Sequence, residues 1–407
     1  MAEYRIGSTQ VGRDPQEVVV EKPPRKPWTR RTKVTISVVV LVFFFVVVPV
    51  VSMTAYVFVP LRGQKTGYDW TPEMNFNDLR AVAGHELGMP EDRDLRVLML
   101  SDLHVSFFSW ARSFRKTFRM MDYLVELTEP DLIVLMGDNV GYFWNNLSVN
   151  HLARHMDRYG IPWAAVIGNH DERGRGDRNY IAARLGNTEH GLFKFGPNSL
   201  YRVSGNYFIN LVNRYNYIVH TLYLMGCEPQ YGLGQNYRAI PEEQIEWFRW
   251  AKNGNPAVES TIMKHIPLRE FHNAWYYGEH IFGYKRNPVH RPTGSRIHAP
   301  EDTSEFFEAI LETGRVRNFF AGHDHYNNFS AMYRGLRMTY AIYSSWSMIS
   351  EVYWLNKALP RGGTLLTVAH DGSTRQRHVI ASAVRHTPSL HVTTRGELDL
   401  WLNAGLQ

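Results

Sequence analysis

Cysteine is almost absent from this sequence of 407 residues, in which Cys227 is the only one. A single cysteine cannot form a disulfide within the chain or a cysteine-based metal site, so neither holds this fold together. Internal repeats are also missing, and only residues 1–33, where prolines alternate with charged residues, have the composition of a disordered tail. The sequence does contain 44% hydrophobic and 13% aromatic residues, which is typical of a globular protein with a sizeable core.

Net charge is small outside this N-terminal tail. Residues 1–33 hold eight Lys or Arg and four Asp or Glu, so they account for +4 of the total net charge of +6. The remaining residues carry a net charge of only +2, which is far from the basic surface typical of nucleic-acid binding. We therefore expect no nucleic-acid partner.

Charge is absent altogether between Lys33 and Arg62. This run exceeds the roughly 20 apolar residues that suffice to cross a bilayer. The main alternative is a cleaved signal peptide, but the run is longer than the apolar part of such a peptide. We predict one transmembrane signal anchor at residues 34–61, preceded by a basic cytoplasmic tail at residues 1–33. Since the basic flank stays in the cytoplasm, the hypothesis is a single-pass membrane protein whose remaining chain is lumenal, extracellular or periplasmic.

Strand-like and helix-like patterns alternate in the rest of the chain, which argues for an α/β fold. Strands are expected at 95–100, 132–136, 164–167, 207–212, 217–224, 260–263 and 317–321, and helices at 113–127, 241–251 and 303–312. Residues 332–381 look β-rich, which predicts a second sheet packed on the first. We expect residues 62–94 to form an irregular linker and residues 382–407 a C-terminal tail.

Side chains of the kinds that bind metals follow five of these predicted strands. In chain order they are Asp102 and His104, Asp138, Asn169, His265, and finally His323 and His325. Ligands bind at the carboxyl ends of strands in open α/β sheets, so the five loops should converge. Each residue alone has an ordinary explanation as a helix cap or turn, but a neutral account needs five coincidences in order. Imidazole and carboxylate together suit Mn, Fe or Zn.

This order of motifs, DxH, GD, GNHD, a lone His and GHxH, resembles the calcineurin-like metallophosphoesterase superfamily over about residues 95–381. The segment around the last motif is similar to the membrane-anchored, purple-acid-phosphatase-like branch. The resemblance implies a double β-sandwich flanked by helices that binds two divalent metal ions. It implies the following ligands: Asp102, His104, Asp138 and His325 for the first metal, and Asp138 as a bridge, Asn169, His265 and His323 for the second.

Further roles also follow from the resemblance. His170 is expected to lie beside the substrate and protonate the leaving group, with Asp171 orienting its ring. Arg173 and Arg175 come directly after this motif, and we predict that they bind the phosphate group. The tyrosine that binds ferric iron in purple acid phosphatases is replaced by His104, so a purple iron site is not expected.

The predicted function is hydrolysis of a phosphate ester by a metal-bridging hydroxide, with a phosphomonoester favoured as the substrate. Two alternatives stay open. One is a phosphodiesterase acting on a lipid headgroup or nucleotide, and the other is a catalytically silent binding module on the same fold.

Overall fold

The computed structural model describes residues 29–48, 67–106, 112–141, 145–172, 178–227, 237–283, 297–346 and 360–381. The chain divides into two units, Met1–Pro60 and Leu61–Gln407. In the first unit, α1 (Arg30–Val42) begins after Thr29, whose hydroxyl accepts a hydrogen bond from the backbone N–H of Thr32. The helix continues as a π-helical turn, η1 (Phe43–Val47).

The predicted transmembrane anchor is wrong. Within the ranges just given, no helix is long and apolar enough to cross a membrane. The helix described there runs without a break from Arg30 to Val48, and its first turn is basic, so its apolar part is shorter than about 20 residues. Residues 49–61 of the expected span lie outside the described part of the chain. The predicted single-pass topology with a cytoplasmic N-terminus depended on this anchor and is wrong as well.

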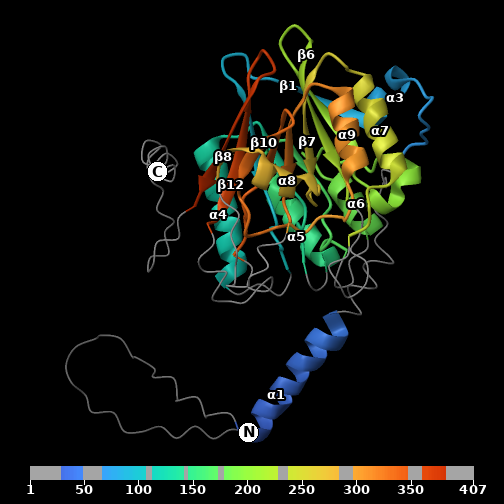
Figure 1. Ribbon diagram of the computed structural model, residues 1–407. Helices are drawn as coiled ribbons and strands as arrows, with labels where there is room; N and C mark the ends of the chain where they lie inside the picture. The colour runs from blue at the N-terminus through green and yellow to red at the C-terminus, as the bar shows by residue number, and fades with distance from the viewer. Residues whose placement is uncertain are drawn as a thin grey trace, which may run out of the picture. The chain divides into compact units, whose positions relative to one another are not determined.

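The second unit is built on two β-sheets (Figure 1). The five-stranded sheet has the order β13-β12-β2-β3-β4, and the eight-stranded sheet has the order β1-β5-β6-β7-β9-β11-β10-β8. The strands are β1 (Gly84–Gly88), β2 (Leu95–Leu100), β3 (Leu132–Leu135), β4 (Trp163–Ala165), β5 (Tyr207–Val212), β6 (Ile218–Met225), β7 (Glu259–Lys264), β8 (Glu279–Phe282), β9 (Val316–Ala321), β10 (Ser330–Tyr333), β11 (Leu336–Tyr340), β12 (Gly362–Val368) and β13 (Thr374–Ile380).

Helices connect and cover these sheets. They are α3 (Phe76–Ala83), α4 (Arg112–Thr128), α5 (Asn145–Asp157), α6 (Arg178–Gly186), the 3₁₀ helix η2 (Asn198–Val203), α7 (Glu242–Asn253), α8 (Glu270–Tyr277) and α9 (Ser304–Thr313). Helices α7 and α9 lie side by side (Figure 1), and the rings of Phe248 and Phe306 meet edge to face between them at 5.3 Å. The predicted α/β fold with two sheets and flanking helices is confirmed. Residues 332–381 do not form the second sheet by themselves, however, because β11 belongs to the eight-stranded sheet and β12 and β13 to the five-stranded sheet.

One apolar core joins the two sheets. It contains Leu98 and Val134 of the five-stranded sheet together with Ile209 and Leu224 of the eight-stranded sheet, all fully buried. A second core lies between the eight-stranded sheet and the helices that include α7 and α9. Strands β2 and β3 are apolar along nearly their whole length because they are buried on both faces. Packing of the sheets therefore fixes where their strand ends meet.

Part of the expected linker is folded. The side chain of Asn75 accepts a hydrogen bond from the backbone N–H of Asn77 and starts α3, and β1 follows directly. Strand β1 pairs in parallel with β5 at the edge of the eight-stranded sheet. Its sequence, Gly-His-Glu-Leu-Gly, has no regular apolar alternation, so edge pairing rather than local pattern makes it a strand.

Candidate metal centre

The predicted ligands follow the carboxyl ends of strands in both sheets. Strands β2, β3 and β4 are parallel neighbours in one sheet, and β7 and β9 are parallel neighbours in the other. Backbone hydrogen bonds join loops within each sheet: His104 N donates to Asp138 O at 2.8 Å, and Gly322 N donates to His265 O at 2.9 Å. Across the sheets, His323 N donates to Asp102 Oδ2 at 3.1 Å. The loops of the two sheets thus converge on one site, as the sequence predicts.

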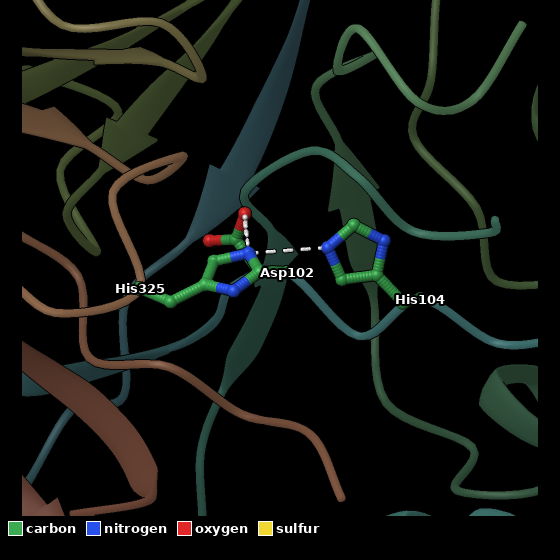
Figure 2. Close-up of side chains that lie close together, drawn as sticks. All are labelled: Asp102, His104 and His325. Atoms are coloured by element: carbon green, nitrogen blue, oxygen red, sulfur yellow. Dashed lines mark hydrogen bonds and ion pairs between the residues drawn. The ribbon is translucent and has the colours of Figure 1, made fainter. Parts of the chain in front are cut away.

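The first metal cluster consists of Asp102, His104 and His325 (Figure 2). The Nε2 atom of His325 lies 3.3 Å from Asp102 Oδ1 and 3.1 Å from His104 Nε2. Asp102 and His104 are each 1% exposed. Three potential ligand atoms from both sheets therefore face one small volume, which is what a metal site requires.

The second metal cluster consists of Asp138, His265 and His323. His265 Nε2 lies 3.2 Å from both Asp138 Oδ1 and Asn169 Oδ1, and its other ring nitrogen, Nδ1, lies 2.9 Å from the carbonyl oxygen of Met136. That carbonyl accepts the Nδ1 proton, so Nε2 is the nitrogen that can bind a metal once it is deprotonated. Asn169, 2% exposed, thus also faces this cluster.

Asp138 lies between the two clusters. Its Oδ1 faces His265, and its Oδ2 lies 3.8 Å from His104 Nε2 and 3.9 Å from His170 Nε2. Asp138, His104 and His170 form a third group whose ligand atoms are close enough to share an ion. A carboxylate between two clusters has the arrangement of a bridging ligand.

The carboxylates stay ionised although they are buried. Burial alone raises the pKa of Asp102 and of Asp138, but His325 beside the first and His265 beside the second lower both pKa values below the ordinary range. The imidazoles shift in both directions. Burial lowers the pKa of His104 and of His323 to about 3.

His265 is the exception among these imidazoles. Burial tends to lower its pKa, but the carboxylates of Asp138 and Asp102 outweigh burial and raise the pKa to about 9. The protein alone thus uses a protonated imidazole to balance negative charge that a metal cation would neutralise. Metal binding would release that proton.

The backbone is strained at four of the predicted ligands. The φ angles are 57° at Asp102, 44° at His104, 48° at Asp138 and 73° at His323. Each such residue costs of the order of 1–3 kcal/mol and persists because its surroundings hold it, a feature that concentrates at functional sites. Gly168 allows the closest approach, since a Cβ there would overlap the backbone nitrogen and carboxylate of Asp138.

The donor set fits transition-metal binding. Carboxylate, imidazole and amide donors suit Mn, Fe and Zn. His323 provides evidence for a bound metal: among the described residues its buried Nδ1 atom has no hydrogen-bond partner, while its Nε2 atom lies 2.8 Å from the hydroxyl of Tyr237. A buried ring nitrogen with no partner is costly unless a ligand completes it.

The residues predicted to act on the substrate have different surroundings. His170 has a side chain that is 19% exposed, and its ring meets the ring of His104 edge to face at 5.1 Å. The carboxylate of Asp171 does not hold the His170 ring. Instead it accepts hydrogen bonds from the backbone N–H groups of Val140 at 2.8 Å and Gly168 at 2.7 Å.

Asp171 thus fastens two ligand loops to each other rather than orienting an imidazole. Burial, together with the neighbouring charge of Asp138, raises the pKa of Asp171 to about 7. Arg173 and Arg175 lie outside the described residues, so their predicted role stays a prediction.

Several residues near the site were not predicted from the sequence. The ring of Tyr343 stacks on His325 at 4.4 Å, and Tyr237 contacts His323. Asp324 accepts hydrogen bonds from His298 Nδ1 at 2.5 Å and from the Tyr340 hydroxyl at 2.7 Å. Only Asp324 had a sequence signal, because alternation in an extended His-Asp-His segment would turn the middle side chain away from the metals. The segment is not extended at His323, where φ is 73°, so the hydrogen bonds from His298 and Tyr340 are what hold Asp324.

Clusters of this composition, at the strand ends of two packed sheets, place the protein among the metallophosphoesterases. It belongs to the calcineurin-like phosphoesterase family, whose sequence pattern matches residues 95–327.

Similar proteins come from several organisms. The chain is 25% identical over 319 residues to probable inactive purple acid phosphatase 14 of Arabidopsis thaliana, covering 67% of this chain and 76% of that protein. It is 24% identical over 269 residues to phosphatase DCR2 of Saccharomyces cerevisiae, covering 59% of this chain and 45% of that protein. A solved dimetal phosphatase from Danio rerio is 10% identical with a TM-score of 0.47, covering 70% of this chain and 97% of that chain.

Proposed function

We propose that this protein is a two-metal phosphoesterase that hydrolyses phosphate esters, with monoesters as the favoured substrates. The observation that carries the proposal is the convergence of a full ligand set on one site. Each cluster has a carboxylate and two imidazoles, and Asp138 faces both. The ligands proposed for the two metals are Asp102, His104, Asp138, Asn169, His265, His323 and His325.

Two divalent ions, of Mn, Fe or Zn, would lower the pKa of a bound water and neutralise the charge of the phosphate group. The side chains do the rest. Asp138 holds the two clusters together, and Asp171 fixes the loops that carry Asp138 and Asn169. His170, whose side chain is partly exposed, donates a proton to the leaving alkoxide, a step typically worth about 100- to 10,000-fold in rate. Arg173 and Arg175 complete the proposal as phosphate-binding residues.

A binding module without activity is the second candidate, and the names of the relatives favour it in part. The Arabidopsis relative is named inactive, whereas the yeast relative is named a phosphatase. The ligand set argues for activity, because buried carboxylates on a strained backbone beside imidazoles are expected where a metal ion is bound.

The test is hydrolysis by the purified full chain of an aryl phosphate monoester and a bis-aryl phosphate diester, with Mn, Fe and Zn added separately. We expect metal-dependent hydrolysis, faster with the monoester. A preference for the diester would reassign the protein as a phosphodiesterase. A chain that hydrolyses neither compound, whichever metal is added, would be the silent binding module.

A further inference from the structure

A tyrosine outside the motifs contacts one of the proposed metal ligands. Tyr237 lies between β6 and α7, and its hydroxyl oxygen is 2.8 Å from Nε2 of His323. The two rings are nearly perpendicular, with an interplanar angle of 88° and centroids 4.9 Å apart. The hydroxyl is therefore directed at one nitrogen of the imidazole, opposite the nitrogen that has no hydrogen-bond partner.

The position of one proton decides whether His323 can bind a metal. A neutral imidazole carries its proton on one nitrogen and a lone pair on the other. If Nε2–H donates to the oxygen of Tyr237, the lone pair is on Nδ1, which is buried and has no hydrogen-bond partner. If Tyr237 donated to Nε2 instead, Nδ1 would carry the proton and could not bind a metal.

The neighbouring candidate ligand His265 is held through its other ring nitrogen. Its Nδ1 contacts the backbone carbonyl of Met136 at 2.9 Å, so its Nε2 faces Asp138. A backbone carbonyl can only accept a hydrogen bond, so it sets the tautomer of His265 by itself. A hydroxyl can accept or donate, and it belongs to a side chain that a substitution can remove.

We propose that Tyr237 is a positioning residue for the second metal cluster. Its hydroxyl accepts the Nε2 proton of His323 and holds the ring with Nδ1 toward the metal. This inference rests on the metal site of the proposed function. Partners of this kind beyond the ligands are typically worth 10- to 100-fold in metal affinity.

The substitution Tyr237→Phe separates this role from simple packing, because the ring that meets His323 is kept and only the hydroxyl is lost. The matched control is Tyr223→Phe, which removes a buried hydroxyl that contacts the carbonyl oxygen of Ala251 at 3.3 Å, in the core on the helix side of the eight-stranded sheet. Metal-free full-length protein is titrated with Zn or Mn by calorimetry, without substrate. We expect Tyr237→Phe to weaken one binding event about 10- to 100-fold and to leave the other unchanged.

The control variant should keep both affinities. Unchanged binding in Tyr237→Phe, or an equal loss in both binding events, would overturn the proposal, since an equal loss indicates a general structural effect. A measurement on the unaltered protein gives a second test: ¹⁵N NMR of histidine-labelled, zinc-loaded protein should show His323 bound through Nδ1. Binding through Nε2 would refute the role of Tyr237 whatever the variant does.

These measurements need no catalysis. A protein that shows the expected binding but hydrolyses no ester would disprove the proposed function and leave the role of Tyr237 intact. A protein that hydrolyses the ester, but whose metal affinity is unchanged by Tyr237→Phe, would support the proposed function and disprove the role of Tyr237.

Discussion

The two sheets contribute different chemistry to the same site. Loops of the five-stranded sheet supply both carboxylates, one amide and one imidazole, whereas loops of the eight-stranded sheet supply three imidazoles. Three of the four strained ligand positions are on the five-stranded side. Each metal cluster nevertheless combines a carboxylate from the first sheet with imidazole from the second. Both clusters therefore need the packing of the two sheets, whereas the third group, Asp138 with His104 and His170, lies on loops of the five-stranded sheet alone.

The largest effect should come from removing negative charge on the five-stranded side. In Asp138→Asn we expect turnover to fall about 1,000-fold or more, roughly 4 kcal/mol, because both clusters lose the same carboxylate. Steady-state hydrolysis of the aryl phosphate measures this loss. Asp131→Asn is the matched control, since Asp131 lies just before the opposite end of β3 in an ion pair with Arg93 at 2.7 Å. Equal activity in both variants would contradict a bridging role.

Removing one imidazole from the eight-stranded side should be less damaging. His265→Ala leaves the first metal cluster intact, so we expect the chain to keep one metal and to bind the other at least about 100-fold more weakly. Metal content after dialysis, measured by mass spectrometry, tests this. His220→Gln replaces another buried histidine of the same sheet and should change neither metal. Loss of both metals in His265→Ala would mean that the clusters do not fill independently.

Metal removal should weaken the association of the two sheets. A ligand present at a hundredfold excess over its Kd stabilises the folded state by about 2.7 kcal/mol. We expect EDTA to lower the Tm of the metal-loaded chain by several degrees, as followed by circular dichroism. The Asp138→Asn variant, with its site already impaired, should respond much less. A Tm indifferent to EDTA would show that metals do not bridge the sheets.

The smallest effect concerns acid stability, to which both sheets contribute equally. Burial lowers the pKa of His220 in β6 and of His378 in β13 from 6.5 to about 4. The unfolded chain therefore takes up these protons first as the pH falls, and stability is lost between about pH 6.5 and pH 4. Between pH 7 and pH 5 each histidine should cost about 2 kcal/mol.

Urea denaturation at the two pH values tests this expectation. His220→Gln and His378→Gln cannot titrate, so each should lose less stability on acidification than the unaltered chain, and by similar amounts. If only one variant reduced the acid sensitivity, the two sheets would not be equivalent in this respect.

The convergence of the candidate ligands was predictable because the signal is local. Strands such as β2 and β5 are apolar runs with the predicted bounds, and a ligand-type residue directly after a strand is visible in the sequence. The contact between Tyr237 and His323 was not predictable, since 86 residues separate them and no spacing rule links them. Likewise, nothing in the GNHD motif shows that the carboxylate of Asp171 accepts backbone hydrogen bonds from two loops.

The membrane anchor, by contrast, was predicted from the sequence and is wrong. Hydropathy sums side chains over a window, but a helical span also needs an uninterrupted helix of sufficient length. The helix that the structure describes there runs from residue 30 to residue 48 and begins with two arginines, so its apolar part is shorter than the uncharged run in the sequence.

The positive φ angles at Asp102, His104, Asp138 and His323 also limit how this protein could change over time. If a descendant lost its metals, metal binding would no longer constrain the residues at these positions, but the positive φ angles still would. Glycine and asparagine adopt this conformation most easily, and β-branched residues do so only at high cost. We expect such a descendant to carry Asn or Gly there rather than Val or Ile, so that the shape of the site would outlast its chemistry.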